Sequence, residues 1–227
     1  VYVYIYQAKL LKYKSESSKD VNNISYRATN TLQVNNILQK ATNILNEINT
    51  TFESPIRLIE IANLQYTLKN YGPARQISLQ LEEKFSKREG PKFKQELYAN
   101  LGHITHAQGD WEQSIAYSKE ALKWTILTKN NQQIAANNLN LAFAYQNAKK
   151  YRRAEPYYIE SIKYAKLVHD DRIKESSTLR LIEVLQLQGN INKAKKALIE
   201  LSDVFIKNIQ LEHNKKLYQK LKGKLLN

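Results

Sequence analysis

The chain has 227 residues, of which 42% are hydrophobic and 25% charged, with 6 Gly, 4 Pro and no Cys. This balance is typical of a folded protein with a substantial core rather than a disordered one. So few Gly and Pro favour long helices over a fold with many turns. The lack of Cys excludes disulfides, thiolate metal sites and cysteine nucleophiles. The chain also has no Met, so we expect residue 1 to begin a processed form or a fragment.

The formal net charge is +14, which can attract nucleic acid, acidic membranes or acidic proteins. The lysines are scattered and often stand beside Glu, so we interpret most of them as solvated surface. No apolar run approaches the ~20 residues that a membrane span needs, and the segment from Val1 to Tyr6 lacks the basic residues of a signal peptide. We therefore expect no membrane span, and the cytoplasm is the favoured compartment.

Residues 1–53 predict a degenerate N-terminal helical hairpin. Residues 32–52 have apolar side chains at helical spacing. Their expected partner is a helix over 1–13, with 15–29 as an inserted loop. The alternative for 1–13 is a strand, because its first apolar residues alternate with Tyr.

A period of 40 residues divides residues 54–206 into four repeats. One column of the repeat is small in every copy: Ala74, Ser114, Ala154 and Ala194. A second column is large, three residues earlier: Tyr71, Trp111, Tyr151 and Ile191. A third is aliphatic: Ile61, Leu101, Leu141 and Leu181. Within each copy the apolar residues recur at helical spacing, so each copy predicts a helical hairpin that must stack on its neighbours to bury both faces.

A short turn is expected to join the two helices of each copy. The Gly-Asp pair at 109–110 and the Gly-Asn pair at 189–190 match this role. Gly adopts the left-handed backbone that ends a helix, and Asp or Asn caps the next one. Lys149 and Lys150 depart from the pattern, so we expect their turn to be the least ideal.

Residues 207–227 predict a basic C-terminal capping helix, because a solenoid needs a terminal helix with a polar outer face. Its apolar side is formed by Leu211, Leu217, Leu221 and Leu225. Its basic residues face few acids: Lys207, Lys215, Lys216, Lys220, Lys222 and Lys224.

The second copy carries the residues Leu101, Gly102, Gly109, Asp110, Trp111, Ser114 and Ala121. This pattern resembles a tetratricopeptide repeat, and the third copy, from Asn138 to Tyr158, is similar to the repeats of kinesin light chains. The resemblance covers residues 54–206, with 40 residues in place of the usual ~34. It implies an all-α fold, a right-handed α-solenoid of stacked antiparallel hairpins, in which the first helix of each hairpin lines a concave groove.

The resemblance also implies the residues of a peptide-binding groove. These are Asn63, Asn100, His103, His106, Asn140, Phe143, Gln146, Asn147, Arg180 and Glu183. Two of the Asn residues, at 100 and 140, would hold the backbone of an extended peptide, because a carboxamide both donates and accepts hydrogen bonds. Neighbouring aromatic and charged side chains would add selectivity. The alternative is that these Asn residues are merely solvated.

Metal binding and catalysis find no support in the sequence. His103 and His106 have a spacing that could hold a metal ion, but no third ligand is evident. No phosphate loop, nucleophile elbow or zinc motif occurs. We therefore expect no metal, no cofactor and no catalytic residue.

The favoured hypothesis is a non-catalytic scaffold that binds a protein or peptide in its groove. The first alternative is a peptide-sensing regulatory domain of a bacterial signalling protein, which a helix-turn-helix upstream of this chain would favour. The least favoured is a basic solenoid that binds nucleic acid through the C-terminal helix, with affinity falling steeply as salt rises.

Overall fold

The computed structural model describes residues 32–34, 36–37, 39–40, 54–67, 69–207 and 209–226. All regular secondary structure in these ranges is helical. The helix or strand expected over 1–13 and the loop expected over 15–29 lie outside the described residues, as does most of the helix expected over 32–52. The chain forms two compact units, residues 1–85 and 86–227, and each is described by itself.

The first unit contains the helical hairpin of α3 (Pro55–Thr67) and α4 (Tyr71–Phe85), which pack against each other. Small and aliphatic residues are buried along both helices, among them Ala62 and Ala74, each with no exposed surface. Across the turn, the rings of Tyr66 and Tyr71 lie 5.8 Å apart between centroids. The hairpin thus uses the small column at Ala74 to bring its two helices together.

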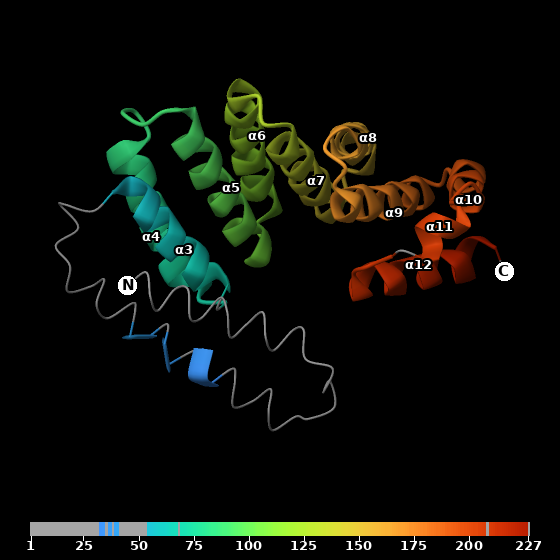
Figure 1. Ribbon diagram of the computed structural model, residues 1–227, viewed down its shortest axis with the longest axis horizontal. Helices are drawn as coiled ribbons and strands as arrows, with labels where there is room; N and C mark the ends of the chain where they lie inside the picture. The colour runs from blue at the N-terminus through green and yellow to red at the C-terminus, as the bar shows by residue number, and fades with distance from the viewer. Residues whose placement is uncertain are drawn as a thin grey trace. The chain divides into compact units, whose positions relative to one another are not determined.

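The second unit continues the same pattern of successive hairpins, coloured green to red in Figure 1. Its helices, in the described residues, are α5 (Pro91–Ala107), α6 (Trp111–Thr128), α7 (Asn131–Asn147), α8 (Tyr151–Leu167), α9 (Asp171–Leu187), α10 (Ile191–Ile199), α11 (Asp203–Lys207) and α12 (Glu212–Leu225). Each helix from α5 to α10 packs on its neighbours in the chain. The expectation of an all-α solenoid of stacked antiparallel hairpins is therefore confirmed, while the predicted repeat boundaries remain a prediction.

The turns inside the hairpins share one backbone conformation at a spacing of 40 residues. The residues at 69, 109, 149 and 189 all have positive φ: Lys69, Gly109, Lys149 and Gly189. At Lys149 φ is 59°, so the lysine adopts the conformation that glycine adopts in the second and fourth turns. The next residue, Lys150, gives α8 no side-chain cap.

The capping of the second helices follows the sequence only in part. Asp110 accepts a hydrogen bond from the backbone N–H of Gln113 at 3.2 Å, as expected. Asn190 makes no such cap; its amide nitrogen donates to the side chain of Gln188 at 2.8 Å. The first helices α7 and α9 are capped by Asn130 and Asp170.

The small column permits close helix contacts in the second unit as well. Ser114 donates its hydroxyl to the carbonyl of Gly102 at 3.0 Å, which joins α6 to α5. A Cβ at Gly102 would lie 3.0 Å from the hydroxyl of Ser118. The contact is tight, because a Cβ at this position would displace the Ser118 side chain by a few tenths of an ångström.

Two apolar clusters contribute to the core of the second unit. The first joins α6, α7, α8 and α9 around Leu141, Tyr158 and Val184. The second joins α9 and α10 to α12, whose Leu217, Leu221 and Leu225 are buried in it. No helix in the described part of the chain is long and apolar enough to cross a bilayer.

Candidate functional site

The first helices of the hairpins form the inner side of the second unit. Successive first helices contact one another, α5 with α7 and α7 with α9, and α12 then packs on α9. Contacts between the second helices α6, α8 and α10 are fewer. The stack therefore curves with its first helices on the inside, where most of the residues singled out by the resemblance lie.

Two histidines of α5 are hydrogen bonded to two asparagines of α7. The Nδ2 of Asn140 lies 3.3 Å from Nε2 of His103, and the Nδ2 of Asn147 lies 3.0 Å from Nε2 of His106. An amide nitrogen can only donate, so each ring nitrogen accepts and must be deprotonated. These bonds hold two successive hairpins together on their inner side.

Burial favours the same neutral state of both histidines. The pKa of His103 is lowered to about 4, first by burial and then by the nearby His106. The pKa of His106 is also lowered, by burial and by the charge of Arg180. Both rings are therefore uncharged at neutral pH and remain acceptors for the asparagine amides.

A stack of three side chains crosses the inner side from α5 to α9. The ring of His106 lies on that of Phe143, with centroids 4.8 Å apart and 29° between the planes. The guanidinium of Arg180 lies 4.6 Å from the centroid of the same phenyl ring. All three are half-buried, so the stack is partly accessible to a ligand. We name these residues, together with Asn140 and Asn147, the inner face.

Beside the inner face, the buried carboxylate of Glu183 organises the contact of α7, α9 and α12. It accepts hydrogen bonds from Gln146 at 2.8 Å, Arg180 at 3.2 Å and Lys220 at 2.9 Å. Burial alone would raise the pKa of Glu183, but the hydrogen bonds from Lys220 and Gln146 and the charge of Arg180 lower it. The carboxylate thus stays ionised, and its hydrogen bonds hold the three helices together.

The structure brings together eight of the ten residues expected in the groove. These are His103, His106, Asn140, Phe143, Gln146, Asn147, Arg180 and Glu183. Gln146 and Glu183 are buried beneath the surface. Asn63 is exposed on α3 in the first unit. Asn100 is only 2% exposed, so its amide is not presented on the surface in this arrangement.

Lys220 belongs to this group, although it was expected only as part of a basic capping surface. Its ammonium binds the buried Glu183, while the side chain is 52% exposed. The sequence contains a signal for this placement, because Lys220 stands 40 residues after Arg180 and Leu221 stands 40 after Leu181. The α12 helix therefore occupies the register of a further first helix.

The family comparison concerns the middle of the chain. Residues 95–166, which span α5 to α8 in large part, match the family model of the tetratricopeptide repeat. These residues are similar to tetratricopeptide repeats. The resemblance inferred from the second and third copies is thereby confirmed.

Solved structures with the same tetratricopeptide fold extend the likeness along the chain. The apo form of RapI is 14% identical and matches 100% of this chain and 77% of its own, with a TM-score of 0.75. A kinesin light chain-like protein of Podosopora anserina with nearly identical repeats is 13% identical over 96% of this chain and 95% of its own, with a TM-score of 0.63.

A Rap protein complexed with Competence and Sporulation Factor is 12% identical, matching 98% of this chain and 71% of its own, with a TM-score of 0.60. No curated protein matches the sequence. Identities this low show a shared fold, a solenoid of tetratricopeptide repeats, and nothing further about function.

Proposed function

We propose that this chain is a non-catalytic scaffold that binds a protein or peptide on the inner face of its tetratricopeptide repeats. The observation that carries the proposal is the half-buried stack of His106, Phe143 and Arg180, flanked by the amides of Asn140 and Asn147. An aromatic centre beside groups that donate and accept is what recognition of a peptide requires.

The second candidate is a peptide-sensing domain of a bacterial signalling protein. It is favoured by the likeness to the apo form of RapI over the whole of this chain. It is favoured also by the likeness to a Rap protein complexed with Competence and Sporulation Factor. A sensing domain would use the same inner face, but binding would have to change its conformation.

The inner face can be tested by selecting ligands from a displayed library of random linear peptides. Selected peptides are then titrated against the wild type, against Asn140→Ala/Phe143→Ala, and against a control, Asn192→Ala/Ile159→Ala. The control removes the same kinds of groups from exposed positions on α10 and α8. Circular dichroism and thermal melting verify that each variant is folded.

We expect the inner-face variant to bind at least about tenfold more weakly, since loss of a central aromatic anchor costs about 2 kcal/mol. The control should bind within about twofold of the wild type. Equal affinity of all three proteins would show that the inner face is not the binding surface. Small-angle scattering with and without a selected peptide separates the candidates: a changed radius of gyration supports sensing, and an unchanged one supports a static scaffold.

A further inference from the structure

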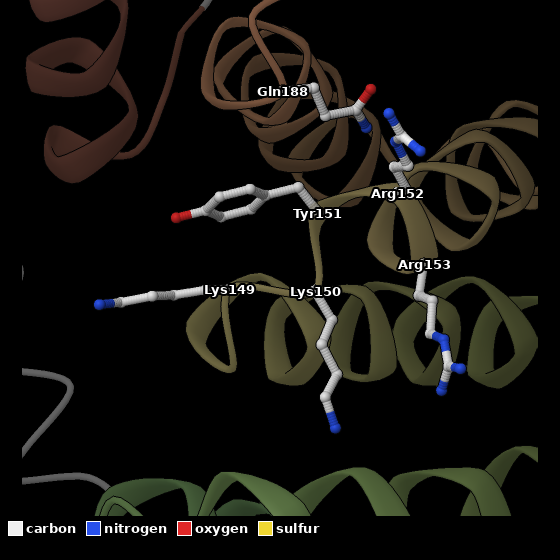
Figure 2. Close-up of a pocket in the computed structure, with 6 residues that line it drawn as sticks. All are labelled: Lys149, Lys150, Tyr151, Arg152, Arg153 and Gln188. Atoms are coloured by element: carbon white, nitrogen blue, oxygen red, sulfur yellow. The ribbon is translucent and has the colours of Figure 1, made fainter.

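A second surface with an unusual charge lies at the turn between α7 and α8. A pocket of about 400 Å³ opens there, and Figure 2 shows the side chains that surround it. Its lining consists of Lys149, Lys150, Tyr151, Arg152, Arg153 and Gln188. Four of these six are cations, contributed by five consecutive residues. We name this site the basic pocket.

Little within the described chain neutralises this charge. Lys150 pairs with Glu112, but Lys149, Arg152 and Arg153 make no ion pair with any described residue. The α8 helix has no acidic residue in its first turn and no side-chain cap. The positive end of its backbone dipole therefore adds to the cations rather than opposing them.

Hydrogen bonds fix one residue of the basic pocket, while its cations point in several directions (Figure 2). Gln188 is held in place, because its amide nitrogen donates to Glu155 at 2.9 Å and its oxygen accepts from Asn190. In Figure 2 the side chains of Lys149 and Tyr151 point in the same direction, with Arg152 and Gln188 on another side of the site. Guanidinium groups bind carboxylates with two parallel hydrogen bonds, and ammonium groups add point charge.

We propose that the basic pocket binds an acidic segment of a partner protein through two or more of its carboxylates. The volume suits a few side chains rather than a long polymer. Glu112 and Glu155 border the cations, so the positive potential is confined to one turn. A nucleic-acid backbone needs cations along a longer path than this turn offers. The proposal does not depend on the inner face, because it rests on different residues at the edge of the stack.

The test uses a fluorescently labelled hexaglutamate peptide, with hexaglutamine as its neutral counterpart, in buffer of low ionic strength. Binding is measured by fluorescence anisotropy to the wild type, to Arg152→Gln/Arg153→Gln, and to Lys215→Gln/Lys216→Gln. Both variants lose two positive charges from exposed side chains, but only the first pair lines the basic pocket. Circular dichroism confirms the fold of each.

We expect hexaglutamate, and not hexaglutamine, to bind the wild type, with affinity falling as salt rises. The basic-pocket variant should bind about tenfold more weakly or worse, because charge-assisted hydrogen bonds are lost, and the α12 variant should stay within about twofold. An equal loss of affinity in both variants would show that binding depends only on the net charge of the protein, and it would overturn the proposal. Absence of hexaglutamate binding would also overturn it, as would tighter binding of a single-stranded oligonucleotide of equal charge.

Discussion

At the scale of single residues, the turns show how one backbone requirement is met by different side chains. Gly109 and Gly189 have φ of 79° and 81°, and Lys69 and Lys149 have 64° and 59° at the equivalent positions. A side chain with a Cβ is strained in this region by about 1–2 kcal/mol, whereas glycine is not. The lysines hold this strained conformation because the packing of the helices on either side fixes the backbone path of the turn.

We predict that Lys149→Gly raises the free energy of unfolding by about 0.5 kcal/mol. The relief of strain exceeds the extra entropy of glycine in the unfolded chain, which offsets about 0.5–1 kcal/mol. The matched reverse change is Gly189→Ala, where an added Cβ meets no atom within 4 Å. Its expected loss of about 0.5 kcal/mol is the same balance of backbone strain and unfolded-chain entropy with the opposite sign. Urea unfolding measures both. A Lys149→Gly protein less stable than the wild type would contradict the account.

At the scale of the elements, the contact of α5 with α7 depends on two histidines that must stay neutral. His103 has a pKa of about 4 in the folded chain, against about 6.5 in an unfolded one. Its stabilising contribution is thus fully present above pH 6.5 and is lost as the pH falls toward 4, because the unfolded chain takes up the proton first. Protonation would also abolish the hydrogen bond that Nε2 accepts from Asn140.

We therefore predict that the free energy of unfolding falls by on the order of 2 kcal/mol between pH 7 and pH 5, as judged by urea titration at each pH. The pKa of Glu183 is lowered, so this carboxylate titrates below this window. The variant His103→Gln keeps a hydrogen-bonding partner for Asn140 but cannot be protonated, so it should lose most of the pH dependence. His106, whose pKa is also lowered, accounts for the slope that remains. If the free energy of unfolding of His103→Gln changes with pH as steeply as that of the wild type, groups other than His103 cause the pH dependence.

At the scale of the whole molecule, each helix of the second unit depends mainly on its neighbours in the stack. The α12 helix closes one end of this unit by burying Leu217, Leu221 and Leu225 against α9 and α10. Buried polar contacts reinforce the closure: Glu175 accepts hydrogen bonds from Asn214 at 2.7 Å and from the backbone of Gln210. In a stack of this kind, stability is approximately a sum of local terms.

We predict that Leu221→Ala, at a side chain with no exposed surface, destabilises the α9–α12 end by about 2–5 kcal/mol. Hydrogen exchange followed by mass spectrometry should show faster exchange in α9 and α12, with α6 unchanged. The control Leu226→Ala removes an exposed leucine at the end of the same helix and should change neither. A uniform rise in exchange from α5 to α12 would show that the unit unfolds as one cooperative block.

Much of the fold could be predicted because its rule is local and repeated. The residues at 71, 111, 151 and 191 each begin the second helix of a hairpin, as their shared column indicates. The capping role expected for Asn190 was wrong: its side chain bonds to Gln188 and makes no hydrogen bond to the first turn of α10. The left-handed backbone of Lys149 was also beyond prediction from its residue type, since lysine does not favour that conformation.

The site could be predicted only as a set of positions along helices. The period indicated that residues near 103, 143 and 183 share a side, and it extends to Lys220, which was assigned instead to a capping surface. The spacing could not indicate that the amides of Asn140 and Asn147 would bind histidines of the preceding hairpin. It also gave no sign that Asn100 would be buried while Asn140 is half-buried.

The sequence by itself determined the helical hairpins, their period of 40 residues and the small residues that let them stack, because these depend on backbone propensity and on residue size. Only the tertiary structure decided which polar groups pair across helices, which remain at the surface of the inner face, and which cations of the basic pocket have no ionic partner among the described residues. The physical reason is that hydrogen bonding, burial and charge neutralisation depend on neighbours some 40 residues away in the chain, and these become neighbours only once the hairpins are stacked.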